Sequence, residues 1–296
     1  MSSPKGMLAA MPLLLDSLWR ALLSCLHPRV IALSLLPLLL IACLSLGLGY
    51  GYGSVAVDAM RSWLDGAGPL ARLVGWWRSW GLPDATPWLA PLLVVALAAP
   101  LMVLLCLLVV ALGMMPALVA WVAQRRFAAL ERKKGASFVA SVAWSLGSTA
   151  LAMVALVLSL PLWLVPPLVL LLPPLIWGWL TYRVMAFDAL AEHASAAERK
   201  VLLQRHRMGL LLVGVACGYL GAAPAVVWAS GVFFAAAFFI LIPVGIWIYT
   251  MVFAFSGLWF AHFCLAALQR LRAENARPGP GDPLPPLQPA PPGLQG

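Results

Sequence analysis

The chain has 296 residues, of which 63% are apolar and only 10% are charged, and its mean hydropathy is +0.96. Soluble domains typically carry about 25% charged residues, so this composition disfavours a soluble enzyme, a disordered chain and a disulfide scaffold. It predicts an all-α integral membrane protein. The formal charge of +9 is typical of basic cytoplasmic loops, so no nucleic-acid partner is expected.

Residues 1–29 are predicted to form a cytoplasmic amphipathic N-terminal helix. Asp16, Arg20, Ser24 and His27 recur at three- or four-residue spacing, and leucines fill the other side. Such a helix is too short and too polar to span a bilayer, so it is expected to lie among the headgroups. No small-x-small site follows a short apolar core, so no cleavable signal peptide is predicted.

The membrane domain is predicted over residues 30–268. Val30 to about Tyr50 is almost wholly apolar, and about 20 such residues cross a ~30 Å hydrocarbon core. Residues 51–87 are rich in tryptophan, which is enriched at membrane interfaces, and their three arginines balance three aspartates. We therefore expect an extracytoplasmic loop with one or two surface helices.

The next apolar run extends from Leu89 to about Val122 and contains three prolines that can start or bend a tilted spanning helix: Pro91, Pro100 and Pro116. It leads into the basic segment 123–140, which is predicted to be a cytoplasmic loop. A second basic segment, 183–207, is assigned to the same side of the membrane.

Between these two loops, residues 146–180 carry no formal charge and have a proline-rich middle. Because both flanks lie on one side, the segment must enter and return. Two crossings need about 40 residues, so a re-entrant helical hairpin is predicted. The alternative is two crossings that borrow from residues 138–144 and 181–190.

Met208–Leu268 repeats this plan, with the turn or kink expected at Gly221–Pro224 or at Pro243. Pro173-x-x-Ile176-Trp177 is weakly echoed by Pro243-x-x-Ile246-Trp247, as in a duplicated transporter element. The proline- and glycine-rich residues 269–296 are predicted to form a disordered cytoplasmic tail. With both termini in the cytoplasm, the only Lys and Arg residues outside are those of the neutral outer loop: Arg61, Arg72 and Arg78.

The sequence contains no P-loop and no metalloprotease motif, and its four histidines are scattered. The five cysteines form no Cys-x-x-Cys pair and are expected to be free thiols. We therefore predict no catalytic residue, no cofactor and no metal site, and we expect that the protein is not an enzyme.

Four arginines are candidate anion contacts, because guanidinium groups match oxyanions geometrically. Arg29, Arg125 and Arg126 lie at predicted helix ends on the cytoplasmic face, where the alternative role is to set topology by touching lipid phosphate. Arg183 interrupts an apolar helix near Asp188. It could contact a permeant anion, pair with Asp188 or snorkel to the headgroups.

Two segments suggest a family. His27-Pro-Arg-Val-Ile-Ala-Leu-Ser-Leu-Leu-Pro-Leu-Leu-Leu40 and Tyr182…Phe187-Asp188, the latter followed by Leu203-Gln-Arg205, resemble the CysZ-like family of bacterial inner-membrane proteins, within the etoposide-induced-protein superfamily. The resemblance covers about residues 13–268 and identifies a divergent branch, with Met115-Pro-Ala-Leu118 in place of the family's Pro-Phe-Asn segment.

The resemblance implies half-penetrating helical hairpins, a homo-oligomer and sulfate permeation. It also implies that arginines at the start of the first spanning helix contact the oxyanion, a position that Arg29 matches. We therefore predict a permease or channel-like protein for a small inorganic anion such as sulfate; the alternative is a non-transporting scaffold that binds lipid or a partner during envelope biogenesis. Further candidates for structural or partner contacts are Tyr182, Phe187, Asp188, Pro173, Pro174 and Pro243.

Overall fold

The computed structural model describes residues 4–66, 69–81, 83–229 and 234–276. The described part of the chain is 89% helical and contains no strand. Within this described part, four helices are long and apolar enough to cross a membrane, over Pro28–Asp65, Thr86–Cys106, Val139–Leu164 and Pro243–Asn275. The prediction of an all-α membrane protein is confirmed.

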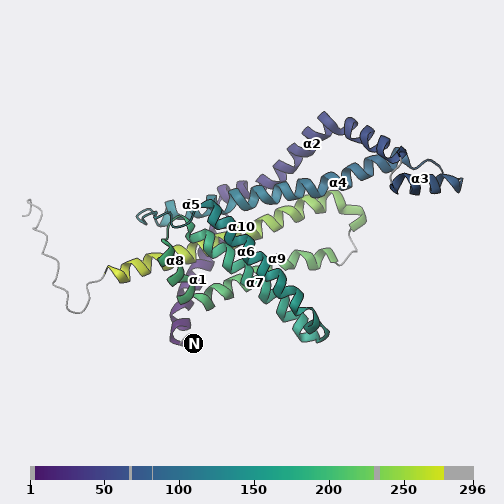
Figure 1. The fold of residues 1–296 in the computed structure, drawn as a ribbon. Helices are drawn as coiled ribbons and strands as arrows, with labels where there is room; N and C mark the ends of the chain where they lie inside the picture. The colour runs from purple at the N-terminus through teal and green to yellow at the C-terminus, as the bar shows by residue number, and fades with distance from the viewer. Residues whose placement is uncertain (1–3, 67–68, 82, 230–233, 277–296) are drawn as a thin grey trace, which may run out of the picture.

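The helices follow one another along the chain as labelled in Figure 1. Their bounds are α1 Pro4–Cys25, α2 Pro28–Asp65, α3 Pro69–Ser79, α4 Thr86–Val109, α5 Met115–Arg126, α6 Phe138–Ser159, α7 Pro166–Ala191, α8 Ala196–Arg205, α9 Arg207–Ala229 and α10 Phe234–Asn275.

Helix α10 is the centre of the bundle. It packs against α1, α2, α5, α7, α8 and α9, and every residue from Ala254 to Leu268 is buried. A helix that is apolar all round is typically buried among other helices or in lipid, and here the neighbouring helices bury this part of α10. Polar contacts add specificity, since the indole nitrogen of Trp247 donates to Ser34 Oγ on α2 at 3.0 Å.

The predicted N-terminal helix is present as α1, and it packs on α10. Leu13, Ser17 and Ala21 form its buried face, and the indole N–H of Trp259 donates to Ser17 Oγ at 3.1 Å. Small residues on this face allow α1 to approach α10 closely. The other side of α1 leaves large apolar side chains exposed, among them Trp19.

Helices α2 and α4 form a long arm that leaves the rest of the bundle, with α3 at its tip (Figure 1). Helix α2 continues to Asp65, so residues 51–65 of the expected outer loop are helical. At the tip, Leu64, Val74 and Ala90 form a small apolar cluster. Arg78 adds an ion pair to Asp84 at 2.8 Å, and its hydrogen bond lowers the pKa of the Asp84 carboxyl.

The second long helix is interrupted before Pro116. Residues Val110–Met114 form a π-helical turn between α4 and α5. Proline lacks an N–H and its ring clashes with the carbonyl four residues earlier, and a wider turn relieves that clash. Of the three prolines expected to start or bend the helix between Leu89 and Val122, Pro116 is therefore the one that closely follows a break in α-helical geometry.

The two hairpins differ in where they turn. Helices α6 and α7 are joined by a 3₁₀ turn at Leu160–Leu164, and their arms include residues 138–144 and 181–190, the flanks that the second alternative required. The expected turn or kink is not a turn at either Gly221–Pro224 or Pro243, because the backbone is helical at both places. Helix α9 ends at Ala229, and α10, which begins at Phe234, packs against α9.

Helices α7 and α9 cross at glycines. A Cβ atom on Gly214 would lie 2.2 Å from the carbonyl oxygen of Gly178, and one on Gly178 would lie 2.6 Å from Val215 Cα. Gly214 and Gly218 form a Gly-x-x-x-Gly motif, which lets helix backbones approach closely in membranes. This contact positions the first hairpin against the second.

The C-terminal end of α10 is anchored by Arg272. Its guanidinium forms an ion pair with Glu198 at 3.0 Å and donates to the carbonyl oxygens of Glu131 at 2.9 Å and His193 at 2.7 Å. Residues 269–275, assigned above to the tail, are therefore helical. The rest of the predicted disordered tail, 277–296, lies outside the described residues.

Replacing Glu198 with glutamine is expected to lower the free energy of unfolding at pH 7 by about 2 kcal/mol. Hydrogen bonds from Arg272, acting against burial, lower the pKa of Glu198 to about 2 from 4.5. The stabilisation is therefore present above pH 4.5 and is lost as the pH falls through 2. Thermal unfolding of wild type and variant at pH 7 and pH 3 measures it. A destabilisation as large at pH 3 as at pH 7 would contradict this assignment.

Candidate anion-binding site

The first candidate arginine lies at the start of α2. His27 caps this helix, because its Nδ1 accepts a hydrogen bond from the backbone N–H of Arg29 at 3.3 Å, and Pro28 occupies the first turn. The N-terminus of a helix carries a partial positive charge that favours anions. The Arg29 side chain is exposed and forms no ion pair with any described residue.

Trp121 on α5 brings a second arginine to the same place. The rings of His27 and Trp121 lie 5.1 Å apart, and the guanidinium of Arg125 lies over the Trp121 indole, 5.1 Å from its centre. Arg125 is also exposed and has no ion pair within the described chain. The backbone of Arg29 and the guanidinium of Arg125, which are far apart in sequence, thus contact the two rings of one aromatic pair at the N-terminus of α2.

Arg126 has a different environment. It forms a 2.8 Å ion pair with Asp16 on α1, and Asp16 also bonds Arg20 at 2.8 Å. Burial raises the pKa of the Asp16 carboxyl, but the hydrogen bonds from these two arginines prevail and lower it. Arg126 is therefore ion-paired within the protein and ties α5 to α1.

Arg183 lies apart from the other three, on the first hairpin. Its guanidinium is held between the indoles of Trp144 at 4.2 Å and Trp179 at 5.1 Å. Asp188 accepts a hydrogen bond from Ser141 Oγ. Since Asp188 forms no ion pair with Arg183 in the described part of the chain, pairing of these two residues is not observed.

The other residues named from the sequence have structural surroundings. Tyr182 is buried beside Gly214 at the α7–α9 crossing. Phe187 stacks on Trp144 with ring centres 5.1 Å apart, and its other contact is the guanidinium of Arg199 at 4.2 Å.

Pro173 and Pro174 line an open, largely apolar cavity of about 540 Å³ between α7, α9 and α10. Pro243 is not among its lining residues. Trp177 of the first proline motif lines this cavity, whereas Trp247 of the second bonds Ser34. The two echoed motifs thus occupy the second arms of both hairpins but have different contacts.

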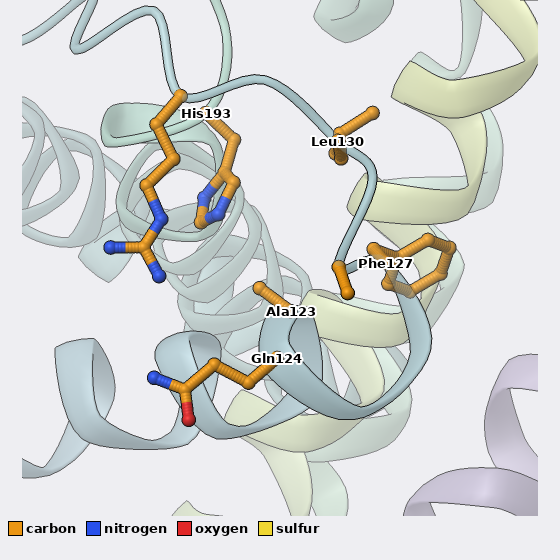
Figure 2. A pocket seen from close by; sticks show the side chains of 7 residues that line it. Ala123, Gln124, Phe127, Leu130 and His193 are labelled. Atoms are coloured by element: carbon orange, nitrogen blue, oxygen red, sulfur yellow. The ribbon is translucent and has the colours of Figure 1, made fainter.

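A smaller pocket, of about 160 Å³, lies where α5 leads into the following loop. In Figure 2 the His193 ring and the Gln124 amide lie on one side of it, and Phe127 and Leu130 lie on the other. Burial lowers the pKa of His193, which keeps the imidazole neutral at pH 7. Sequence reasoning missed this pocket, because its polar groups come from α5, the loop after it and the segment between α7 and α8, which carry no joint motif.

The described residues hold no group of three or more His, Cys, Asp or Glu side chains suited to a metal ion. All five cysteines are free, and Cys106, Cys217 and Cys264 are buried. The chemistry that this part of the chain offers is therefore that of guanidinium groups, aromatic rings and helix ends.

These features define a multi-pass, all-α membrane protein with a long helical arm, two helical hairpins and unpaired arginines at one helix N-terminus. A family model described as "Sulfate transporter CysZ/Etoposide-induced protein 2.4" matches residues 17–230, so the chain belongs to this family. No curated protein and no solved structure matches it.

Proposed function

We propose that the protein is a permease or channel-like protein for a small anion, sulfate being the first candidate, and that it is not an enzyme. The observation that carries this proposal is the pair of exposed arginines, Arg29 and Arg125, beside the N-terminus of α2 in a member of this family. Both guanidiniums lack a carboxylate partner among the described residues. They can therefore donate hydrogen bonds to a bound oxyanion.

The exposure of both arginines suits permeation. A transported ion must bind well enough to enter and weakly enough to leave. An exposed guanidinium pair in water gives weak, salt-sensitive attraction. The apolar helices also contain few carboxylates, which argues against coupling to a cation, because such transporters use buried acids.

Uptake of radiolabelled sulfate into proteoliposomes tests the proposal. We expect saturable uptake above that of protein-free vesicles, and competition by unlabelled sulfate. Phosphate and sulfite, offered as alternative labelled substrates, establish which oxyanion is preferred. Uptake equal to that of protein-free vesicles for all three ions would refute a permease function.

We further propose that the protein lies in the bacterial inner membrane with both termini in the cytoplasm. This orientation is supported by the positions of the basic residues, since Arg125 and Arg126 end α5, Arg205 ends α8, and Arg270 and Arg272 lie near the end of α10. Basic residues favour the cytoplasmic side. A fluorescent protein fused after the last residue is expected to fluoresce, and an alkaline phosphatase fused there is expected to be inactive. The opposite pattern would reverse the orientation.

A homo-oligomer is part of the same proposal. The α2–α4 arm leaves many large apolar side chains uncovered, including Leu39, Leu46 and Leu97, and a second copy can cover them. Native mass spectrometry from detergent reports the number of chains directly. A single chain under all lipid and detergent conditions would contradict this part.

The second candidate function is a non-transporting scaffold that binds lipid or a partner in envelope biogenesis. The apolar cavity between α7, α9 and α10, lined by Pro173, Pro174 and Trp177, favours it. A deletion strain distinguishes the two functions: an envelope defect that added sulfur sources do not cure supports the scaffold, whereas a sulfur requirement supports the permease.

A further inference from the structure

Arg183 occupies an aromatic clamp built by two helices of the first hairpin. Trp144 of α6 and Trp179 of α7 cover its guanidinium at 4.2 and 5.1 Å. The indole N–H of Trp144 donates to the backbone carbonyl of Arg183 at 3.0 Å, which fixes the inner ring of the clamp. Phe187 stacks on Trp144 as well, with ring centres 5.1 Å apart, so this ring of the clamp is held in place by two contacts.

The positive charge in this clamp has no counter-charge among the described residues. Asp188, the nearest carboxylate along α7, is bonded to Ser141, and Arg183 forms no ion pair. Its Nε is buried without a partner, and its terminal nitrogens bond no described residue. A half-buried cation is costly unless an anion balances it.

Trp179 offers a second donor one helical turn before Arg183. Its ring centre lies 5.1 Å from the Arg183 guanidinium carbon, it is only partly buried, and its indole N–H bonds no other described residue. An indole N–H and a guanidinium fork presented together fit the oxygens of one phosphate group.

The clamp lies near the end of α7, where the chain becomes charged. Arg183 is nine residues before Glu192, which follows α7, so the two residues are about 13 Å apart along the helix axis at 1.5 Å per residue. This distance exceeds the headgroup layer of about 5–8 Å, so the long Arg183 side chain must extend toward the headgroups, as arginines near helix ends do. Tryptophan and arginine at this boundary are typical lipid-anchoring residues.

We propose that Arg183, clamped by Trp144 and Trp179, binds the phosphate of an anionic phospholipid at the side of the membrane where α7 ends. The lipid phosphate supplies the missing counter-charge and anchors the first hairpin. This site is separate from the Arg29–Arg125 pair and does not depend on transport.

Native mass spectrometry of the purified full chain tests the proposal, with phosphatidylglycerol or phosphatidylcholine as the added lipid. Wild type is expected to retain one phosphatidylglycerol in preference to phosphatidylcholine. Arg183→Gln is expected to weaken phosphatidylglycerol binding about tenfold or more, since a charge-assisted hydrogen bond is lost. Arg183→Lys should restore part of it, and Trp179→Phe should weaken it a few-fold. Arg72→Gln, which removes an exposed charge on the outer arm, is the matched control.

Thermal unfolding of each variant separates binding from folding; if Arg183→Gln does not fold, Arg183→Lys and Trp179→Phe carry the test. Equal phosphatidylglycerol binding by wild type and the folded Arg183 variants would overturn the proposal. Displacement of the lipid by millimolar sulfate or inorganic phosphate would also overturn it, because the clamp would then be a site for a free oxyanion.

Discussion

Gly214→Ala is expected to disrupt the α7–α9 crossing and to lower the free energy of unfolding by about 3 kcal/mol or more. The added Cβ would lie 2.2 Å from the carbonyl oxygen of Gly178 and 3.0 Å from Tyr182 Cβ. The first obstacle is backbone, so no side-chain rotation relieves the overlap, and the helices must separate. Thermal unfolding followed by circular dichroism, with size-exclusion chromatography for recovery, measures the effect.

Gly221→Ala is the matched control, because Gly221 belongs to the same helix and a Cβ there meets nothing within 4 Å. Alanine is favoured over glycine inside a helix by about 1 kcal/mol, so this variant should be at least as stable as wild type. Equal melting temperatures for the two variants would show that α7 and α9 do not pack closely at Gly214.

Arg29→Gln is expected to raise the KM for sulfate uptake by about tenfold, the effect of losing one charge-assisted hydrogen bond. Arg29 offers the guanidinium at the helix end where His27 caps α2, and no described residue neutralises it. The helix itself should form normally, because the cap uses the backbone N–H of residue 29 and not its side chain. KM measured in proteoliposomes, with the melting temperature unchanged, isolates the loss of the anion contact.

Two controls bracket this prediction. Arg207→Gln removes an exposed charge at the start of α9 and should leave KM nearly unchanged. Arg126→Gln breaks the ion pair with Asp16, so it should lower the melting temperature more than it changes KM. If all three substitutions raise KM equally, the effect is one of net charge and Arg29 is no specific contact.

Hydropathy predicted the membrane class, the two hairpins and the approximate position of each long helix, because bilayer thickness sets the length of an apolar run. It did not predict that α2 continues to Asp65. Glycines and charges between residues 47 and 65 resemble a loop in sequence, but the chain stays helical and packs against α4. Hydropathy also did not predict where the second hairpin turns, because Gly221–Pro224 and Pro243 looked equally suitable and both are helical.

For the candidate anion-binding site, the sequence correctly predicted that Arg29 lies at a helix start, because Pro28 and the apolar residues after it mark that start. Its pairing with Arg125 was not predictable, because it depends on Trp121 meeting His27 across two helices. Arg126, which looked equivalent to Arg125, proved to be bonded to Asp16, a contact 110 residues away. The Gly-x-x-x-Gly motif at Gly214 and Gly218 is visible in the sequence and could have predicted the close packing of α9 against another helix.

The most direct measurement of the central claim is the exchange of radiolabelled sulfate across proteoliposomes that contain equal sulfate on both sides. Without a gradient, any flux above that of protein-free vesicles reports a path for the anion through the protein. We predict saturable exchange for the wild type and at least about a tenfold reduction for Arg29→Gln combined with Arg125→Gln, measured below KM. Wild-type exchange equal to that of protein-free vesicles, or equal exchange by the two proteins, would contradict the account.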